Sequence, residues 1–177
     1  MRLFIAITFS KEIIDNLIES RDALKSVSSS LKLSPIENYH LTLAFLGECE
    51  VSDLDWIKNL IDVTFSKKMN MSVKGLGFFE SSSGKIVFRK IDVPSYLFKV
   101  INNMKNKIVE HGIPCDTKPF KPHITLARSA YINKDTKVED IPYKEIRYIA
   151  KDIVLMESIF NDYGPNTYQV IYRKALS

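Results

Sequence analysis

The stretch His40–Gly47, which reads HLTLAFLG, decides how the rest of this chain is interpreted. Its apolar residues are typical of a buried strand, yet it opens with an imidazole and a hydroxyl two residues apart. Side chains at positions i and i+2 of a strand project from the same face of the sheet. We therefore expect His40 and Thr42 to share one face, while Leu41 and Leu43 point into the core from the other.

The same pattern returns later in the chain as HITLARS, which begins at His123. Both copies read His-apolar-Thr-Leu-Ala, and each follows a loop that contains proline. The elements around the two copies also fall in a similar order, which predicts two half-structures related by a pseudo-twofold axis. Such an arrangement would bring His123 and Thr125 into one cleft with His40 and Thr42.

Two imidazoles and two hydroxyls in one cleft suit displacement at phosphorus. An imidazole titrates near neutral pH, so one histidine can hold a proton while the other accepts one. Threonine hydroxyls can donate hydrogen bonds to the oxygens of the phosphate. A single H-x-T in a strand is common and would be read as a satisfied buried histidine, but the two copies use two of only three histidines in the chain. We therefore interpret the pair as functional.

Rival uses of these histidines have less support in the sequence. A metal site needs three or four ligands, and no Asp, Glu or Cys accompanies either histidine at ligand spacing. We therefore expect no metal and no cofactor. No G-x-S-x-G motif indicates a serine nucleophile. The third histidine, His111, stands at the end of a predicted helix, where a cation suits the helix dipole, and we interpret it as structural.

The composition is that of a globular protein. A chain of 177 residues can form one domain or two small lobes that share a core. The formal charge of +4 permits an anionic partner without requiring one. Cys49 and Cys115 show no paired spacing, which is typical of free thiols in a reducing compartment. No apolar run approaches the ~20 residues that cross a bilayer, so we expect a cytoplasmic protein with no membrane partner.

Hydrophobic periodicity predicts an α+β protein. The expected helices span residues 11–27, 52–61 and 95–112, and the expected strands span residues 3–8, 40–47, 69–80, 85–91, 123–129, 148–158 and 167–176. A run of serines at 28–30 is expected to end the first helix, and Gly112 to end the last. Helices interrupt pairs of strands joined by short turns, so antiparallel sheets fit better than a doubly wound parallel sheet.

The chain resembles the 2H phosphoesterase superfamily, whose signature is two H-x-T-x motifs. It is most similar to the branch of RNA 2',3'-cyclic phosphodiesterases, also called 2'-5' RNA ligases of the LigT/ThpR type. The segments that carry this resemblance are MRLFIAI, ENYHLTLAFLGE, KPFKPHITLAR and IVLMES. The resemblance implies a single bilobal domain over residues 1–177. In that fold, two pseudo-symmetric lobes carry antiparallel sheets that line a central cleft, with the helices outside.

The resemblance also implies a reaction that needs no metal and no ATP. Water opens a terminal 2',3'-cyclic phosphate of RNA and leaves a 2'-phosphomonoester, and a 5'-hydroxyl RNA end in place of water gives 2'-5' ligation. His40 would protonate the leaving 3'-oxygen and His123 would activate the water, although the pseudo-symmetry leaves this division open. Thr42 and Thr125 would hold the phosphate oxygens.

Two further residues are candidates for substrate binding. Arg128 stands where the second motif of the family continues with a basic residue. Its guanidinium could pair with a phosphate oxygen or stack on a base, or it could be a solvated charge at the end of a strand. Phe45 holds the matching place in the first motif, where it could stack on the terminal base or pack in the core. Lys118 and Lys121, just before the second motif, could steer RNA by charge.

The expected partners are therefore RNA ends or nucleotides that carry a 2',3'-cyclic phosphate, bound by a monomer. Two alternatives stay open at this point. The enzyme could instead act on 2'-5' oligoadenylate or on a small cyclic nucleotide. The chain could also be an RNA-binding module without turnover, although a decayed site would be expected to lose at least one of the four motif residues.

Overall fold

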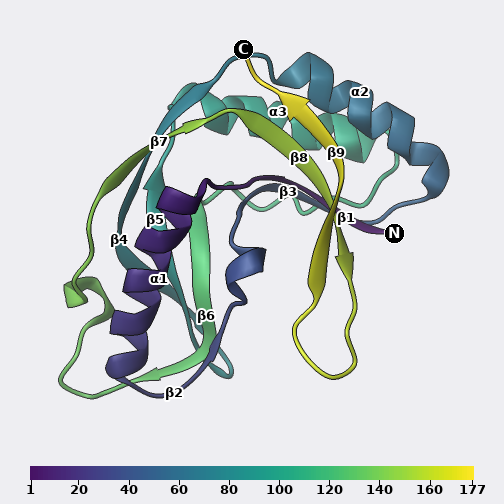
Figure 1. Ribbon diagram of the computed structural model, residues 1–177. Helices are drawn as coiled ribbons and strands as arrows, with labels where there is room; N and C mark the ends of the chain where they lie inside the picture. The colour runs from purple at the N-terminus through teal and green to yellow at the C-terminus, as the bar shows by residue number, and fades with distance from the viewer.

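The computed structural model describes all residues, 1–177, and shows two antiparallel sheets with helices on their outer sides (Figure 1). The strands of the first sheet lie in the order β3 (Leu41–Glu48), β1 (Arg2–Ile7), β8 (Asp152–Ile159) and β9 (Thr167–Ala175). Those of the second lie in the order β2 (Ser28–Leu33), β6 (His123–Ile132), β5 (Gly84–Asp92), β4 (Met69–Ser81) and β7 (Ile146–Ala150). The expected α+β class with antiparallel sheets is confirmed.

The helices are divided between the two sheets. Helix α1 (Lys11–Ser26) packs on the second sheet, whereas α2 (Leu54–Thr64) and α3 (Tyr96–Glu110) contact each other and the first sheet. Figure 1 shows α2 and α3 together at one side of the molecule, with α1 across β4–β6. Short 3-10 helices occur at η1 (Ile36–Asn38), η2 (Val51–Asp53) and η3 (Val138–Asp140). No helix is long and apolar enough to span a membrane.

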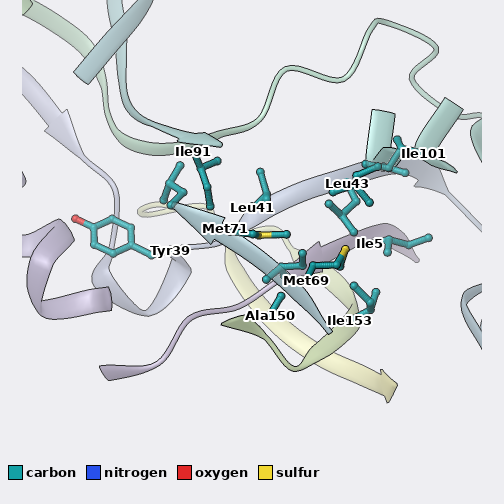
Figure 2. Close-up of a cluster of buried hydrophobic side chains, with 14 of the residues drawn as sticks. Ile5, Tyr39, Leu41, Leu43, Met69, Met71, Ile91, Ile101, Ala150 and Ile153 are labelled. Atoms are coloured by element: carbon teal, nitrogen blue, oxygen red, sulfur yellow. The ribbon is translucent and has the colours of Figure 1, made fainter. Parts of the chain in front are cut away.

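One hydrophobic core joins the two sheets. Leu41 and Leu43 of the first motif are buried in it, at 0% and 1% exposure, as their strand position predicts. Figure 2 shows these leucines beside Met69 and Met71 of the second sheet and Ile101 of α3. Because the same cluster contains residues of both sheets and all three helices, we infer that the chain forms a single domain.

Glycines at two turns adopt left-handed conformations, and Gly112 was expected to end a helix. Gly112 follows α3 with a φ of +92°, a left-handed conformation that lets a chain leave a helix and that favours glycine. The serine-rich segment after β4 closes a tight hairpin, in which Ser81 pairs with Gly84. Gly84 also has a positive φ, of +102°. A Cβ at this position would lie 3.0 Å from backbone atoms of β6, so the hairpin needs glycine there.

The serine run after α1 is where the expected secondary structure is incomplete. Residues 28–33 form β2, an edge strand that pairs with β6, and not only the end of a helix. Serine is typical of turns, and only Leu31 and Leu33 mark an alternating pattern in this segment. Pairing with β6 overrides the local preference. The strand carries Lys32 opposite Arg128 of β6.

A second difference concerns the segment expected as one strand over residues 148–158. The structure divides it at Lys151 into β7, which pairs with β4 in the second sheet, and β8, which pairs with β1 in the first. The chain therefore crosses between the sheets at this residue. A continuous apolar pattern does not reveal such a crossing, because the partners of each strand are distant in sequence.

The two H-x-T motifs also lie in different sheets. The first is on β3, which is the edge strand of the first sheet, and the second is on β6, next to the edge of the second. They do not lie on two strands at the middle of one sheet. The two sheets nevertheless bring both motifs to one cavity.

Candidate active site

The first motif is held in place by hydrogen bonds at both nitrogens of its imidazole. His40 immediately precedes β3, and its Nδ1 lies 2.6 Å from the carbonyl oxygen of Asn38 in η1. Its Nε2 lies 2.8 Å from Oγ1 of Thr42. This contact shows that His40 and Thr42 share one face, as the period of two predicts.

The second motif repeats the same local arrangement. His123 is the first residue of β6, and its Nδ1 lies 2.6 Å from the carbonyl oxygen of Lys121, also two residues before it. A carbonyl oxygen can only accept a hydrogen bond, so Nδ1 carries a proton in both histidines. Nε2 is therefore the nitrogen that can exchange a proton in each ring. Nε2 of His123 has no hydrogen-bond partner within the protein, whereas that of His40 contacts Thr42.

A cavity of about 800 Å³ lies between the two sheets, and both motifs line it. A volume in this range is usual for a site that binds a small molecule or part of a larger one. The four motif residues and the two further candidates for substrate binding line the cavity: His40, Thr42, Phe45, His123, Thr125 and Arg128. The fold therefore brings these six residues together.

All the charged residues that line the cavity are cations. They are Arg2, Lys32 and Arg128, and no Asp or Glu accompanies them. Lys32 and Arg128 are direct partners across β2 and β6. Like charges opposite each other on neighbouring strands repel, so this pair is unfavourable unless an anion lies near it. The charge of the cavity suits an anionic ligand.

Sequence reasoning missed Lys32 and Arg2. Lys32 was missed because the strand that carries it was not expected, and its alternation with Leu31 and Leu33 was the only local signal. Arg2 lies at the start of β1, and its guanidinium is 5.1 Å from the ring centroid of Phe45. Phe45 is half-buried and lines the cavity, so it combines packing with an exposed edge. Lys118 and Lys121 do not line the cavity.

A group of residues from the end of β8, the following turn and β9 forms another part of the wall that the sequence did not predict. These residues are Ser158, Gly164, Pro165, Asn166 and Tyr168. The ring of Tyr168 lies edge-on to His40, with centroids 5.3 Å apart. The side-chain amide of Asn38 donates a hydrogen bond of 2.8 Å to the carbonyl of Asn166, which ties this turn to the segment before His40.

Burial lowers the pKa of both histidines below its ordinary value of 6.5. Aromatic rings cause much of this desolvation, since Phe4 and Tyr168 flank His40 while Phe79 and Phe88 flank His123. The hydrogen bonds from Nδ1 to the carbonyls oppose the shift. The positive charge of Arg128 lowers the pKa of both imidazoles further, and His123 does so for His40.

The third histidine lies away from this cavity, as expected. His111 caps the end of α3, and its ring stacks on Trp56 of α2 with centroids 3.8 Å apart and planes 7° from parallel. Its Nε2 is 3.9 Å from a carboxylate oxygen of Asp53. These contacts join α2 to α3. In the structure, no group of three or more His, Cys, Asp or Glu side chains is placed to hold a metal ion.

Comparison with known proteins agrees with this arrangement. Residues 7–88 match the model of the family described as LigT like Phosphoesterase. The RNA 2',3'-cyclic phosphodiesterase of Archaeoglobus fulgidus is 31% identical over 93% of this chain and 95% of its own. The protein of the same name from Methanocaldococcus jannaschii is 29% identical, over 97% and 98% of the two chains.

Solved structures show the same fold. Escherichia coli LigT in complex with 3'-AMP superposes with a TM-score of 0.82 and 26% identity, over 99% of this chain and 98% of that one. The protein TT0787 of Thermus thermophilus shares the fold with a TM-score of 0.77. The fold and the two-histidine cavity thus define a phosphoesterase of the LigT type. With its similarity to the curated relatives along nearly its whole length, the chain belongs to the family of RNA 2',3'-cyclic phosphodiesterases, which are hydrolases.

Proposed function

We propose that this protein opens the terminal 2',3'-cyclic phosphate of RNA and leaves a 2'-phosphomonoester, without a metal ion. The observation that carries the proposal is the pair of imidazoles whose Nδ1 atoms are both fixed on carbonyls, in a cavity where all charged residues are cations. The names of the relatives support the substrate, and the complex of E. coli LigT with 3'-AMP supports binding of a nucleotide.

In the proposed reaction, Nε2 of neutral His123 takes a proton from water while the water oxygen forms a bond to phosphorus. The bond between phosphorus and the 3'-oxygen breaks in line with the attack, and Nε2–H of protonated His40 delivers its proton to that oxygen. Nε2 of His123 has no partner in the protein and is free to receive a water molecule, which favours it as the base. Each turnover ends with the proton on the other histidine, and exchange with solvent restores the starting state.

The remaining predicted residues would hold the phosphate. The hydroxyls of Thr42 and Thr125 line the cavity beside the imidazoles and can donate hydrogen bonds to the non-bridging oxygens. Arg128 is exposed, forms no ion pair and can offer its guanidinium to the same oxygens. Phe45 would stack on the terminal base. A ribose hydroxyl in place of water would use the same groups, so we extend the proposal to 2'-5' ligation.

An assay with defined RNA ends tests the proposal. A short RNA ending in 2',3'-cyclic phosphate, incubated with the protein in a chelator, is expected to yield only the 2'-phosphomonoester, which chromatography separates from the 3' isomer. A second RNA with a 5'-hydroxyl in the same reaction reports ligation. Absence of the 2'-phosphate product would contradict the proposal. Cleavage of 2'-5' oligoadenylate by the same preparation would then favour the alternative substrate. Binding of RNA with no turnover would favour a binding module.

The pH dependence of the reaction is expected to depend on Arg128. Its positive charge lowers the pKa of both imidazoles, because it disfavours the imidazolium forms. Replacing Arg128 by methionine should therefore raise both pKa values and move both limbs of the profile of kcat/KM to higher pH. A loss of phosphate contact alone would lower the rate at every pH equally. Lys99→Met, on the exposed side of α3, serves as the control for a lost surface charge. Limbs that stay in place would contradict the expectation.

A further inference from the structure

We propose that the tip of the β8–β9 hairpin, residues 159–166, is a stacking subsite for the nucleotide that precedes the cyclic-phosphate end of an RNA chain. The inference rests on the proposed function and adds to it a preference for RNA chains over free cyclic mononucleotides. Figure 1 shows that this hairpin extends away from the body of the molecule beyond the rest of the first sheet.

The tip exposes large apolar side chains to solvent. Tyr163 is 98% exposed, Phe160 is 77% exposed, and Ile159 is also exposed. Scattered apolar side chains on a surface need no explanation, but three on one short turn form a patch. Exposed aromatic rings are the groups on which bases of single-stranded RNA stack, and they accept every base because each base has a π face.

The patch and the wall of the cavity belong to the same turn. Tyr163 directly precedes Gly164, Pro165 and Asn166, which line the cavity together with the two histidines. Asn166 is fixed by two hydrogen bonds, since its carbonyl accepts from the amide of Asn38 and its amide donates to Oγ of Ser158 at 3.1 Å. The carbonyl of Asn38 in turn holds Nδ1 of His40. Hydrogen bonds therefore connect the turn to the segment that positions His40.

The charge of the cavity suits the phosphates of a nucleic acid strand. Lys32 and Arg128 lie opposite each other on β2 and β6, in the other sheet, and neither forms an ion pair within the protein. A strand whose end lies between the histidines can pass between these cations and the hairpin. Its phosphates would then face the cations and a base upstream of the end would face Tyr163 or Phe160. This combination of a basic groove and aromatic platforms is how proteins bind single strands without sequence preference.

The test compares two substrates that differ only in the presence of upstream nucleotides. They are guanosine 2',3'-cyclic monophosphate and a pentanucleotide RNA ending in a 2',3'-cyclic phosphate. We expect Tyr163→Ala to lower the ratio of kcat/KM for the pentanucleotide to that for the mononucleotide by about tenfold, which is the usual size for one lost base stack. Phe160→Ala should act in the same direction. Tyr163→Phe keeps the ring and should keep the ratio, and Tyr96→Ala, which removes a half-exposed tyrosine of α3, is the matched control.

An unchanged ratio in both alanine variants would overturn the inference. A direct binding measurement separates this failure from failure of the proposed function. Fluorescence anisotropy with a labelled pentanucleotide ending in a 3'-phosphate needs no turnover. If the wild-type protein opens neither cyclic substrate, the proposed function fails, and weaker binding by Tyr163→Ala alone still supports the subsite. If Tyr163→Ala binds the pentanucleotide as tightly as the wild-type protein, the inference is overturned. It is also overturned if the substitution changes only the sedimentation of the protein, because that result would assign the tip to contact between two copies of the chain.

Discussion

Alanine in place of His123 or of His40 is expected to lower kcat by a factor of about 10²–10⁴ in each case, because each replacement removes one proton transfer from the transition state. The double variant should be little slower than the slower single variant, since the two groups act in one concerted displacement. Single-turnover assays with RNA ending in a cyclic phosphate measure these rates. His111→Ala is the matched control, because this histidine stacks on Trp56 outside the cavity and should leave kcat unchanged.

The leaving group separates the two roles. A phosphodiester that releases 4-nitrophenolate needs no proton on its leaving oxygen, so it does not require a general acid. We expect this substrate to restore much of the rate lost in His40→Ala and little of that lost in His123→Ala. The lost limb of the pH profile should be the alkaline limb in His40→Ala and the acidic limb in His123→Ala. Rescue of the His123 variant alone would reverse the assignment of acid and base.

Replacing Arg89 by alanine is expected to lower the free energy of unfolding by about 3–5 kcal/mol. This is the largest effect on stability that we expect from the substitution of one buried polar residue. Arg89 lies on β5 and is 0% exposed. Its guanidinium donates to Oδ1 of Asn16 and Oγ of Ser20 in α1, both at 2.8 Å, and to the carbonyls of Lys74 and Lys144. These bonds join α1 to the second sheet.

The size of this effect follows from the partners that the substitution leaves behind. A buried acceptor without a donor costs about 1–3 kcal/mol, and the lost volume adds a cavity. No carboxylate pairs with Arg89, and burial lowers its pKa to about 10, so the side chain is retained for its hydrogen bonds. Urea unfolding measures the change. Arg147→Ala, on exposed β7, should change stability by less than about 0.5 kcal/mol, and an equal loss in the two variants would contradict this account.

The candidate site could be predicted from the sequence to an unusual degree, because its pattern is local. His40 and Thr42 are two residues apart, and the period of a strand alone places them on one face. The apolar residues that alternate with them, Leu41 and Leu43, define the opposite face, and both are buried. Repetition of the pattern at His123 then identified the partner strand without any structural information.

The residues that were missed depend on contacts between distant segments. Lys32 lies in the cavity only because β2 pairs with β6, and the serines before it favour no strand. Arg89 was expected as an ordinary member of a strand, whereas the packing of α1 on the second sheet buries it completely. The side chains of the β8–β9 turn reach the cavity because the chain crosses from one sheet to the other at Lys151.

The sequence by itself therefore determined which residues form the candidate site and the class of the fold: two histidines and two threonines on strand faces, in an α+β fold with antiparallel sheets. Only the tertiary structure decided which sheet holds each motif, which cations line the cavity and which residues of the β8–β9 turn join its wall. The physical reason is that the direction of a side chain along a strand follows from local backbone geometry. The neighbour of a strand is chosen by the burial of apolar surface and by hydrogen bonds across the whole chain, and a short segment does not encode it.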